Sequence, residues 1–346
     1  MDAETDTSGR VAYSFPSGTF DLLETHGNRC LASEDGTTTY VGLRPPWPRL
    51  FETVRQLHVV LGAAASGPLS LADTWEYPAL TPIPGAGFLF DVDTGTEIHW
   101  HHLASAIAVV DDHGSQQTAS LQFFDRQGKG CLKLMLTNFS NLDAFDRLLG
   151  RFAIPFDSGT SGENSEKAAR EDMPAPKMSA TELVSLWSTL GRTRPDTLVA
   201  GTSTLWRRAA LDALPSELNL AWQCQSMTVM RALELATASH IPLQCSVQNQ
   251  ATQLRSVLRP THWHPCEAGL TFFSPYSQLT LRHSREAWEV WATRYQKVGS
   301  NSGADAGLKL EIYGENGHLC GVLEPAAEAK AKDVVDWNAL LKSYRA

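Results

Sequence analysis

Two stretches of the chain follow the same pattern and decide its fold: Leu121–Cys131, LQFFDRQGKGC, and Leu310–Cys320, LEIYGENGHLC. Each stretch alternates apolar and polar residues, reaches a turn that contains glycine, and starts a returning strand, which predicts a β-hairpin. A helix with one apolar face is expected after each hairpin, over Leu142–Phe152 in the first half and Val334–Tyr344 in the second. Because hairpin and helix recur in the same order, the sequence favours an internal duplication.

The segments before each hairpin extend this prediction to a whole fold. Apolar helical faces are expected over residues 47–57, 183–190 and 227–238, and strands over 88–92, 98–110, 270–273, 279–282 and 290–295. Helices first, then a meander of strands and a closing helix, are typical of α+β proteins. The predicted fold is therefore α+β, a tandem structural repeat in which each half is an antiparallel β-sheet meander with helices packed to one side.

A change of composition separates the two halves. Residues 157–178, DSGTSGENSEKAAREDMPAPKM, are rich in Ser, Gly, Glu, Lys and Pro and have no periodic apolar face. Such a stretch is typical of an exposed, flexible linker. We therefore expect an N-terminal repeat over residues 1–156, a linker over 157–178 and a C-terminal repeat over 179–346.

Composition and missing motifs narrow the function classes. The net charge is −9, from 29 basic and 38 acidic residues, which argues against a general nucleic-acid binder. No apolar run approaches the length of a transmembrane helix, so no membrane insertion is expected. The acidic N-terminus has no features of a secretory signal, and the six cysteines form no CxxC pair, so a cytoplasmic protein is predicted. Dinucleotide-binding, P-loop and G-x-S-x-G motifs are missing from the sequence.

The first hairpin also carries a family resemblance. Ser120–Gly128, followed by Leu132-Lys133-Leu134, resembles the S-[LI]-Q-F-F-D-x-x-G…K hairpin of the HemS/ChuS-type haemin-degrading and haem-trafficking family of bacteria. Asn138–Phe152 resembles the helix that follows this hairpin in the family. Leu233–Leu243, Leu279–Arg282 and Leu310–Leu323 resemble later family segments in the same order. The resemblance covers most of residues 47–152 and 178–346.

The resemblance implies a cytoplasmic haem-utilisation protein. Such a protein binds haem, or a related tetrapyrrole, for trafficking or degradation in iron acquisition. Its partners would be haem-uptake or haem-accepting proteins. In the family, one haem lies in a cleft of the second half, an axial histidine comes from the first helix of that half, and Arg or Lys residues hold the propionates.

The resemblance also assigns site residues. Arg194 matches the family's helix arginine, Arg282 matches its sheet arginine, and Arg294 stands near a family lysine, so all three are expected to hold propionates. An alignment without gaps places the axial histidine position on Thr181, and a shifted alignment places it on Val184. Residues 178–222 contain no histidine, so the usual axial ligand is missing.

Two further family positions differ in this chain. The sheet arginine expected in the first half falls on Glu97, which reverses the charge. In the second half, Arg255 replaces the histidine that ends a family strand.

Two histidine pairs are candidates to replace the missing axial ligand. His99 and His101, and likewise His262 and His264, are two residues apart, which places each pair on one face if it lies on a strand. Neutral imidazoles on one face can ligate a metal ion. Tyr295, as a phenolate, is the other candidate for the missing haem ligand. The alternative is that these are ordinary surface or hydrogen-bonded histidines beside a tryptophan.

Three functional hypotheses follow from these observations. The first is a haem-trafficking protein, and the second is an enzyme that degrades haem oxidatively with a replacement ligand. The third is a non-enzymatic interaction or regulatory protein that retains the scaffold and has lost haem ligation. The sequence leaves the choice between enzyme and carrier open.

Overall fold

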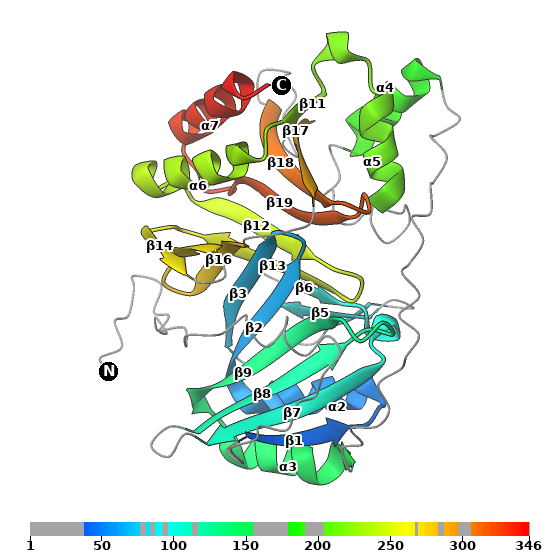
Figure 1. Ribbon diagram of the computed structural model, residues 1–346, viewed down its shortest axis with the longest axis vertical. Coiled ribbons are helices and arrows are strands. Elements are labelled where there is room, and N and C mark those ends of the chain that lie inside the picture. The colour runs from blue at the N-terminus through cyan, green and yellow to red at the C-terminus, as the bar shows by residue number, and fades with distance from the viewer. Residues whose placement is uncertain are drawn as a thin grey trace.

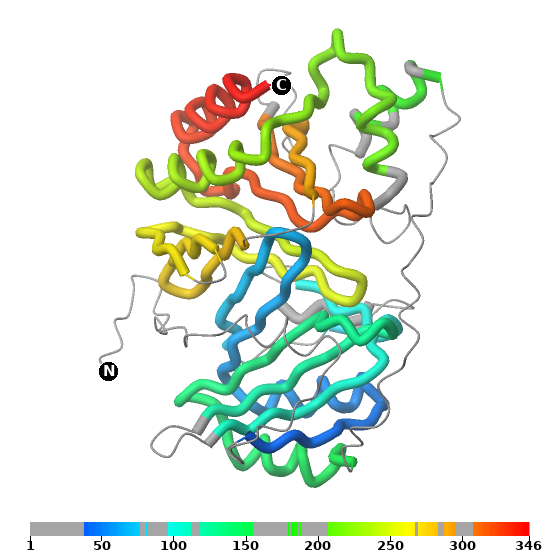
Figure 2. The backbone as a smooth tube through the Cα atoms, viewed as in Figure 1, coloured from blue at the N-terminus to red at the C-terminus, as the bar shows by residue number. Residues whose placement is uncertain are grey.

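The computed structural model consists of two large antiparallel β-sheets with helices at both ends of the molecule (Figures 1 and 2). It describes residues 38–76, 81–83, 87–91, 96–112, 117–154, 179–190, 204–266, 269–282, 287–296 and 306–345. The predicted linker, 157–178, lies outside the described residues. Within the described part of the chain, no helix is long and apolar enough to span a membrane.

The first half has a helix after its first strand, a meander of strands and a closing helix. Its elements are β1 (Thr38–Leu43), α2 (Trp47–Val54), the 3-10 helix η1 (Arg55–Leu57), β2 (His58–Ser66), β3 (Leu69–Glu76), β4 (Thr81–Ile83), β5 (Gly87–Asp91), β6 (Thr96–Ile98), the 3-10 helix η2 (Trp100–His102), β7 (Ser105–Asp112), β8 (Gln117–Phe124), β9 (Gly130–Ser140), α3 (Leu142–Phe152) and β10 (Ala153–Ile154).

The second half begins with two additional helices. Its elements are α4 (Ala180–Leu190), α5 (Thr204–Ala213), the 3-10 helix η3 (Ser216–Leu218), β11 (Ala221–Cys224), α6 (Met227–Ser239), β12 (Leu243–Gln248), β13 (Thr252–Leu258), β14 (His262–Cys266), β15 (Gly269–Phe273), β16 (Ser277–Arg282), β17 (Trp288–Gln296), β18 (Ala306–Gly314), β19 (Leu319–Pro325) and α7 (Ala331–Ser343).

The element order repeats from β1 and again from β11. In the described residues, each half has a strand, a helix, eight strands and a closing helix, if the 3-10 helices and the two-residue β10 are set aside. The two quoted hairpins are β8–β9 and β18–β19, and the helices that close the halves are α3 and α7. The predicted α+β tandem repeat is thus confirmed.

The two halves exchange strands. The first sheet has the order β10-β1-β7-β8-β9-β2-β3-β16-β15-β14, and the second has the order β11-β17-β18-β19-β12-β13-β6-β5-β4. Strand β3 pairs with β16 of the other half, and strand β13 pairs with β6. Each half therefore gives three strands to the sheet of the other half, and the arrangement is reciprocal.

The halves also meet at the turns that join their long strands. A Cβ atom on Gly67, in the β2–β3 turn, would lie 2.6 Å from the Sγ atom of Cys320 in β19. In the equivalent place, Asn249 of the β12–β13 turn donates a hydrogen bond from Nδ2 to the carbonyl of Cys131 in β9, at 2.7 Å. These contacts pack each half against the hairpin of the other.

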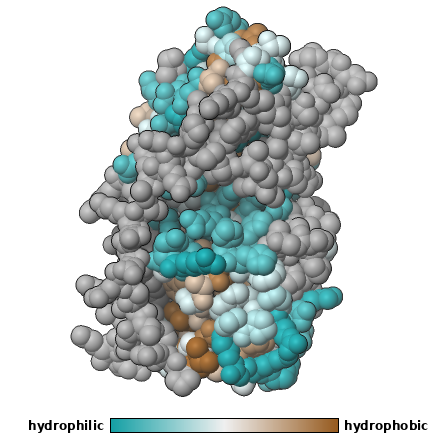
Figure 3. All heavy atoms as spheres, turned by 90° about the vertical axis from the view of Figure 1, so that its right-hand side faces the viewer, coloured by the Kyte–Doolittle hydropathy of each residue, from teal (hydrophilic) through white to brown (hydrophobic). Residues whose placement is uncertain are grey.

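The apolar core lies between each sheet and its pair of helices. In the first half, the fully buried Phe51 of α2 stacks on Phe123 of β8, with 4.9 Å between ring centroids. In the second half, the buried Trp337 of α7 donates from its indole nitrogen to the carbonyl of Leu308, at 2.8 Å. Figure 3 shows one outer face, where hydrophilic residues form a band across the middle and hydrophobic residues gather below it.

Candidate functional site

The second sheet is covered on both faces by helices. Helices α6 and α7 pack on one face, while α4 and α5 pack on the other (Figure 1). Trp187 of α4 and Leu211 of α5 form a separate apolar cluster with Trp291, Tyr313 and Val322 of the sheet. We call the side of the sheet that carries Trp291, Tyr313 and Val322 the α5 face.

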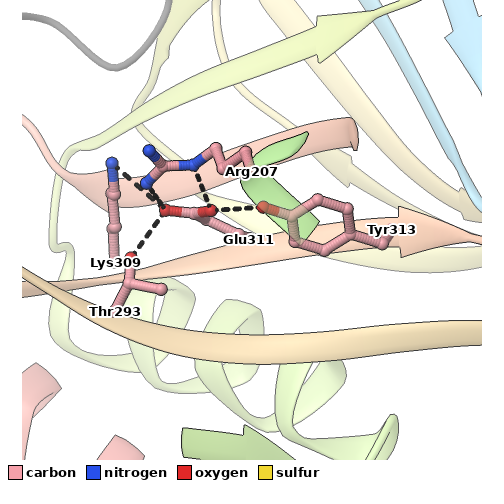
Figure 4. Close-up of polar contacts among 5 residues, drawn as sticks. All are labelled: Arg207, Thr293, Lys309, Glu311 and Tyr313. Atoms are coloured by element: carbon pink, nitrogen blue, oxygen red, sulfur yellow. Dashed lines mark hydrogen bonds and ion pairs between the residues drawn. The ribbon is translucent and has the colours of Figure 1, made fainter. Parts of the chain in front are cut away.

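A buried carboxylate lies at the centre of the α5 face (Figure 4). Glu311 is fully buried and accepts hydrogen bonds from the side chains of Arg207 (Nε, 2.7 Å), Thr293 (2.7 Å) and Tyr313 (2.6 Å). A second nitrogen of Arg207 reaches the other carboxylate oxygen, and the Nζ atom of Lys309 lies 3.2 Å from that oxygen. These five residues are the Glu311 cluster.

The cations of the Glu311 cluster determine the protonation state of the Glu311 carboxylate. Burial alone would raise the pKa of Glu311, but the charges of Arg207 and Lys309 bring it well below its ordinary value. Burial, and then the charge of Glu311, raise the pKa of the Tyr313 phenol. Glu311 is therefore ionised and Tyr313 protonated over the physiological range, so the phenol acts as a hydrogen-bond donor.

Two adjacent arginines fix α5 to the sheet. The guanidinium of Arg207 lies 4.6 Å from the ring centroid of Trp187, and that of Arg208 lies 4.9 Å from the ring centroid of Trp291. Arg208 also forms ion pairs with Glu289 at 2.5 Å and Asp212 at 2.7 Å. Cation–π contacts and ion pairs thus connect α4 and α5 with strands β17 and β18.

A pocket lies beside the Glu311 cluster on the same face. It is a small cavity of about 20 Å³, which holds little more than one water molecule, and five of its seven lining residues are polar or charged. In the strand register, Ser246 of β12 lies between Val322 of β19 and Arg255 of β13, so these strands form the pocket floor. The lining residues are Gln244, Ser246, Gln253, Arg255, Leu319, Val322 and Glu324.

Arg255 is the buried cation of this pocket. It is 4% exposed and donates from one terminal nitrogen to the side-chain oxygen of Gln253, at 3.1 Å. The same nitrogen lies 3.9 Å from one carboxylate oxygen of Glu97. The other oxygen of Glu97 lies 3.4 Å from Nε2 of His99. A line of polar groups therefore runs from the pocket, through Glu97 of β6, to His99.

Two of the predicted site residues lie on α4, the first helix of the second half. Thr181 lies on α4 with its side chain exposed, and Val184 is half-buried on the same helix. Arg194 lies outside the described residues, as does the side chain of Tyr295. Helix α4 thus presents no imidazole at either position that the resemblance assigns to the axial ligand.

The structure places the other two predicted arginines apart from the pocket. Arg282 ends β16 in the first sheet, where its backbone nitrogen donates to the carbonyl of Pro68 at 2.7 Å. Arg294 follows Thr293 on β17, so its side chain leaves the sheet on the side opposite to Thr293 and the Glu311 cluster. The described structure therefore does not bring Arg282 and Arg294 together.

The prediction of a strand through His99 and His101 is wrong. Strand β6 ends at Ile98, and Trp100–His102 form the 3-10 helix η2, because the chain turns here between β6 and β7. Burial, followed by the charges of His99 and His101, lowers the pKa of the neighbouring His102. Burial, and then the neighbouring imidazoles, thus favour the neutral form of His102.

The second histidine pair does lie on a strand. His262 and His264 belong to β14, an exposed edge strand of the first sheet, and face Phe273 and Thr271 of β15 in the register. The ring of His262 stacks on Phe273, with 4.9 Å between centroids. Among the residues that the structure describes, no group of three His, Cys, Asp or Glu side chains is placed to hold a metal ion.

Comparison with known proteins identifies the class of domain. The family model of the haemin-degrading HemS.ChuX domain matches residues 32–152. This match confirms the family resemblance of the first hairpin, since residues 32–152 are similar to the HemS.ChuX domain. No curated protein matches the chain.

Solved structures extend the likeness over nearly the whole chain. Holo-PhuS, a heme-binding protein from Pseudomonas aeruginosa, is 19% identical and matches with a TM-score of 0.72 over 89% of this chain and 87% of PhuS. ChuS, described as a heme degrading enzyme of Escherichia coli O157:H7, is 17% identical, with a TM-score of 0.67 over 89% of this chain and 87% of ChuS. The chain thus has the tandem-repeat fold of PhuS and ChuS.

Proposed function

We propose that this chain binds haem, or a related tetrapyrrole, for trafficking or degradation in iron acquisition. The observation that carries the proposal is the haemin-degrading HemS.ChuX domain over residues 32–152. The fold shared with the heme-binding PhuS and with ChuS supports it. In this proposal the protein acts in the cytoplasm, between haem-uptake proteins and haem-accepting proteins.

The pocket on the α5 face has groups that suit part of a haem molecule. Haem carboxylates are held best by Arg in two-pronged contacts, and the macrocycle needs apolar walls. Arg255 supplies a buried guanidinium, while Leu319 and Val322 supply apolar surface. Because the cavity of about 20 Å³ holds little more than one water molecule, we assign to it no more than one carboxylate of the ligand.

Among the predicted iron ligands, His99 is the one that is connected to this pocket through Glu97 and Arg255. Its Nε2 atom faces a Glu97 oxygen, and a carboxylate partner of this kind orients an imidazole for coordination through its other nitrogen. The helix positions Thr181 and Val184 carry no imidazole. We therefore propose His99 as the first ligand to test, with His101, His262, His264 and Tyr295 as the other candidates.

The predicted propionate contacts Arg194, Arg282 and Arg294 stay predictions. Arg282 belongs to the first sheet, so a role for it would require a contact away from the α5 face. Arg294 shares β17 with Thr293 but points to the other side. Substituting each by Gln separates these assignments from the Arg255 assignment.

Haemin titration of the full chain, followed by the Soret band, tests the proposal. We expect a saturable shift of the band, and binding weakened by about tenfold in Arg255→Gln, which corresponds to the loss of one charged hydrogen bond. His99→Ala should alter the position of the Soret band, and His101→Ala tests the next candidate ligand in the same way. A spectrum that stays identical to that of free haemin would overturn the proposal.

A second measurement separates carriage from degradation. The haem complex is mixed with ascorbate under air, and the Soret band and free iron are followed. Loss of the band with release of iron and an open-chain tetrapyrrole indicates degradation. A stable band, followed by transfer of haem to an added apo-haem protein, indicates trafficking.

A further inference from the structure

Strand β14 is an edge strand of the first sheet, and all five of its residues are exposed (Figure 1). On one side it pairs with β15, and in the part of the chain that the structure describes it ends the strand order of this sheet. Because side chains alternate along a strand, His262, His264 and Cys266 share one face, while Trp263 and Pro265 share the other. The edge therefore carries two imidazoles and a thiol in one row.

Hydrogen bonds leave Nε2 as the unprotonated nitrogen of both imidazoles. The Nδ1 atom of His264 is bonded to the carbonyl oxygen of Pro265, which can only accept, so Nδ1 carries the proton of the neutral ring. The Thr261 hydroxyl donates to the carbonyl of Phe273 at 3.3 Å. Its oxygen therefore accepts from Nδ1 of His262, at 2.9 Å. An imidazole held by an oxygen at Nδ1 in this way is oriented to bind a metal ion through Nε2.

One chain alone supplies two adjacent ligands and not three. The Sγ atom of Cys266 lies 3.4 Å from the Oγ1 atom of Thr271, which is opposite His264 in the register, so the thiol lies on the face of the histidines. Along the strand, however, Cys266 is about 13 Å from His262. Within the ranges that the structure describes, no three His, Cys, Asp or Glu side chains surround one metal position. Because zinc takes three or four such ligands, a further ligand must come from outside the chain.

A second copy of β14 can supply that ligand. If two β14 edges pair antiparallel about His264, then His262 of one copy lies opposite Cys266 of the other, with about 4.5–5.5 Å between their Cβ atoms. His262 and His264 of one copy and Cys266 of the other then surround one position, and the symmetry produces two such positions. On the opposite face, Trp263, which is 43% exposed, comes to lie against Pro265 of the second copy. Ligands and apolar surface are thus matched in the same register.

We propose that two copies of this chain pair through β14 around two Zn²⁺ ions, each bound by His262 and His264 of one copy and Cys266 of the other. Imidazole nitrogen and thiolate sulfur are the ligands that zinc prefers. Pairing of the strands without metal is weak, because β14 is short and Pro265 has no N–H group to donate. Zinc therefore controls the association. The inference does not depend on haem binding.

Sedimentation equilibrium of the full, untagged chain under reducing conditions tests the inference as zinc chloride is added. We expect a monomer in EDTA and a dimer with one Zn²⁺ per chain at saturation. His264→Ala and Cys266→Ser should each weaken zinc binding by more than about tenfold and abolish the dimer, whereas Cys266→His, which keeps a ligand, should retain it. His240→Asn is the matched control, since His240 is exposed, lies outside β14 and has a left-handed backbone that Asn tolerates. It should leave the dimer and the zinc affinity unchanged within about twofold.

Mixing two variants shows whether the ligands come from different copies. His262→Ala/His264→Ala keeps the thiol, and Cys266→Ser keeps both imidazoles, so neither should dimerise alone with zinc. Their mixture should form a dimer that holds one Zn²⁺. A mixture that stays monomeric, a zinc-bound monomer of the unaltered chain, or a zinc dimer that survives Cys266→Ser would overturn the inference. None of these results bears on the proposed function, which the haemin titration tests separately.

Discussion

The carboxylate of Glu311 connects side chains from three elements. Arg207 comes from α5, Thr293 from β17, and Lys309 and Tyr313 from β18 itself. Two cations around one buried carboxylate are stable only while that carboxylate is present and ionised. The polar contact of Arg207 with the sheet therefore depends on this one carboxylate.

Replacing Glu311 by Gln should lower the free energy of unfolding by about 3–5 kcal/mol, because it leaves buried cations without their counter-charge. Chemical denaturation of the purified chain measures this change. The exposed pair of Arg259 and Glu328 provides the control, and Glu328→Gln should cost less than about 1 kcal/mol. Similar losses in both variants would contradict the assigned role of the Glu311 cluster.

The same residue predicts a dependence of stability on pH. The pKa of Glu311 is lowered on folding, so its contribution is fully present above its ordinary pKa of 4.5 and is lost as the pH falls toward the folded value. The stability difference between the unaltered chain and Glu311→Gln should therefore be constant near neutral pH and shrink below about pH 4.5. Urea unfolding at several pH values checks this, and a difference that grows in acid would refute it.

The residues of the Glu311 cluster were not predictable from their strand pattern. Lys309, Glu311 and Tyr313 alternate with Leu308, Leu310 and Ile312, and such alternation is typical of a strand with one solvent-exposed face. That face is instead covered by α5, a helix about 100 positions earlier in the chain. Local periodicity reports which residues share a face, but it contains no information about what packs against that face.

At the scale of elements, the contact between β19 and the other half leaves no room for a side chain. A Cβ atom on Gly321 would lie 2.5 Å from the carbonyl oxygen of Ser246 and 2.6 Å from Leu69. Gly150, within α3, has nothing within 4 Å of the equivalent position. The two glycines therefore differ in what an added methyl group would meet.

We expect Gly321→Ala to destabilise the chain by about 1–3 kcal/mol, as overpacking does. Gly150→Ala, the matched control, should stabilise it by about 0.5–1 kcal/mol, because alanine favours a helix interior. Thermal denaturation of both variants measures the opposite shifts. An unchanged melting temperature in Gly321→Ala would show that the junction between β19 and the first half is looser than described.

Elements with a strong local pattern were predicted well. The hairpins β8–β9 and β18–β19, the closing helices α3 and α7, and helix α6 all lie where the sequence placed them. The strand predicted over residues 98–110 is interrupted by η2 at Trp100–His102. Its apolar and aromatic residues satisfy a strand pattern, but the chain must turn there to pass from the second sheet to the first.

At the scale of the whole molecule, strand exchange joins the two halves into one structure. The sequence indicated two similar halves but not that β4–β6 and β14–β16 lie in the sheet of the other half. Alternation along a strand fixes which residues share a face and leaves the partner strand unspecified. The same limit applies to the candidate site, since Glu97 and Arg255 meet only through this exchange.

Strand exchange predicts that the two halves unfold together. Removing either half would expose the edges of β3 or β13 and leave three strands without a sheet. Calorimetry of the full chain should therefore give one transition, with equal calorimetric and van't Hoff enthalpies, and far-UV and near-UV signals should coincide. Two separate transitions, one for each sheet, would contradict this account.

The central claim is that haem binds on the α5 face of the second sheet. Anomalous scattering at the iron edge, measured from crystals of the haemin complex, locates the iron directly. The account predicts one iron peak beside the pocket of Arg255, within reach of His99, with a propionate on the guanidinium. An iron peak against the first sheet, or no ordered iron in crystals grown with saturating haemin, would contradict it.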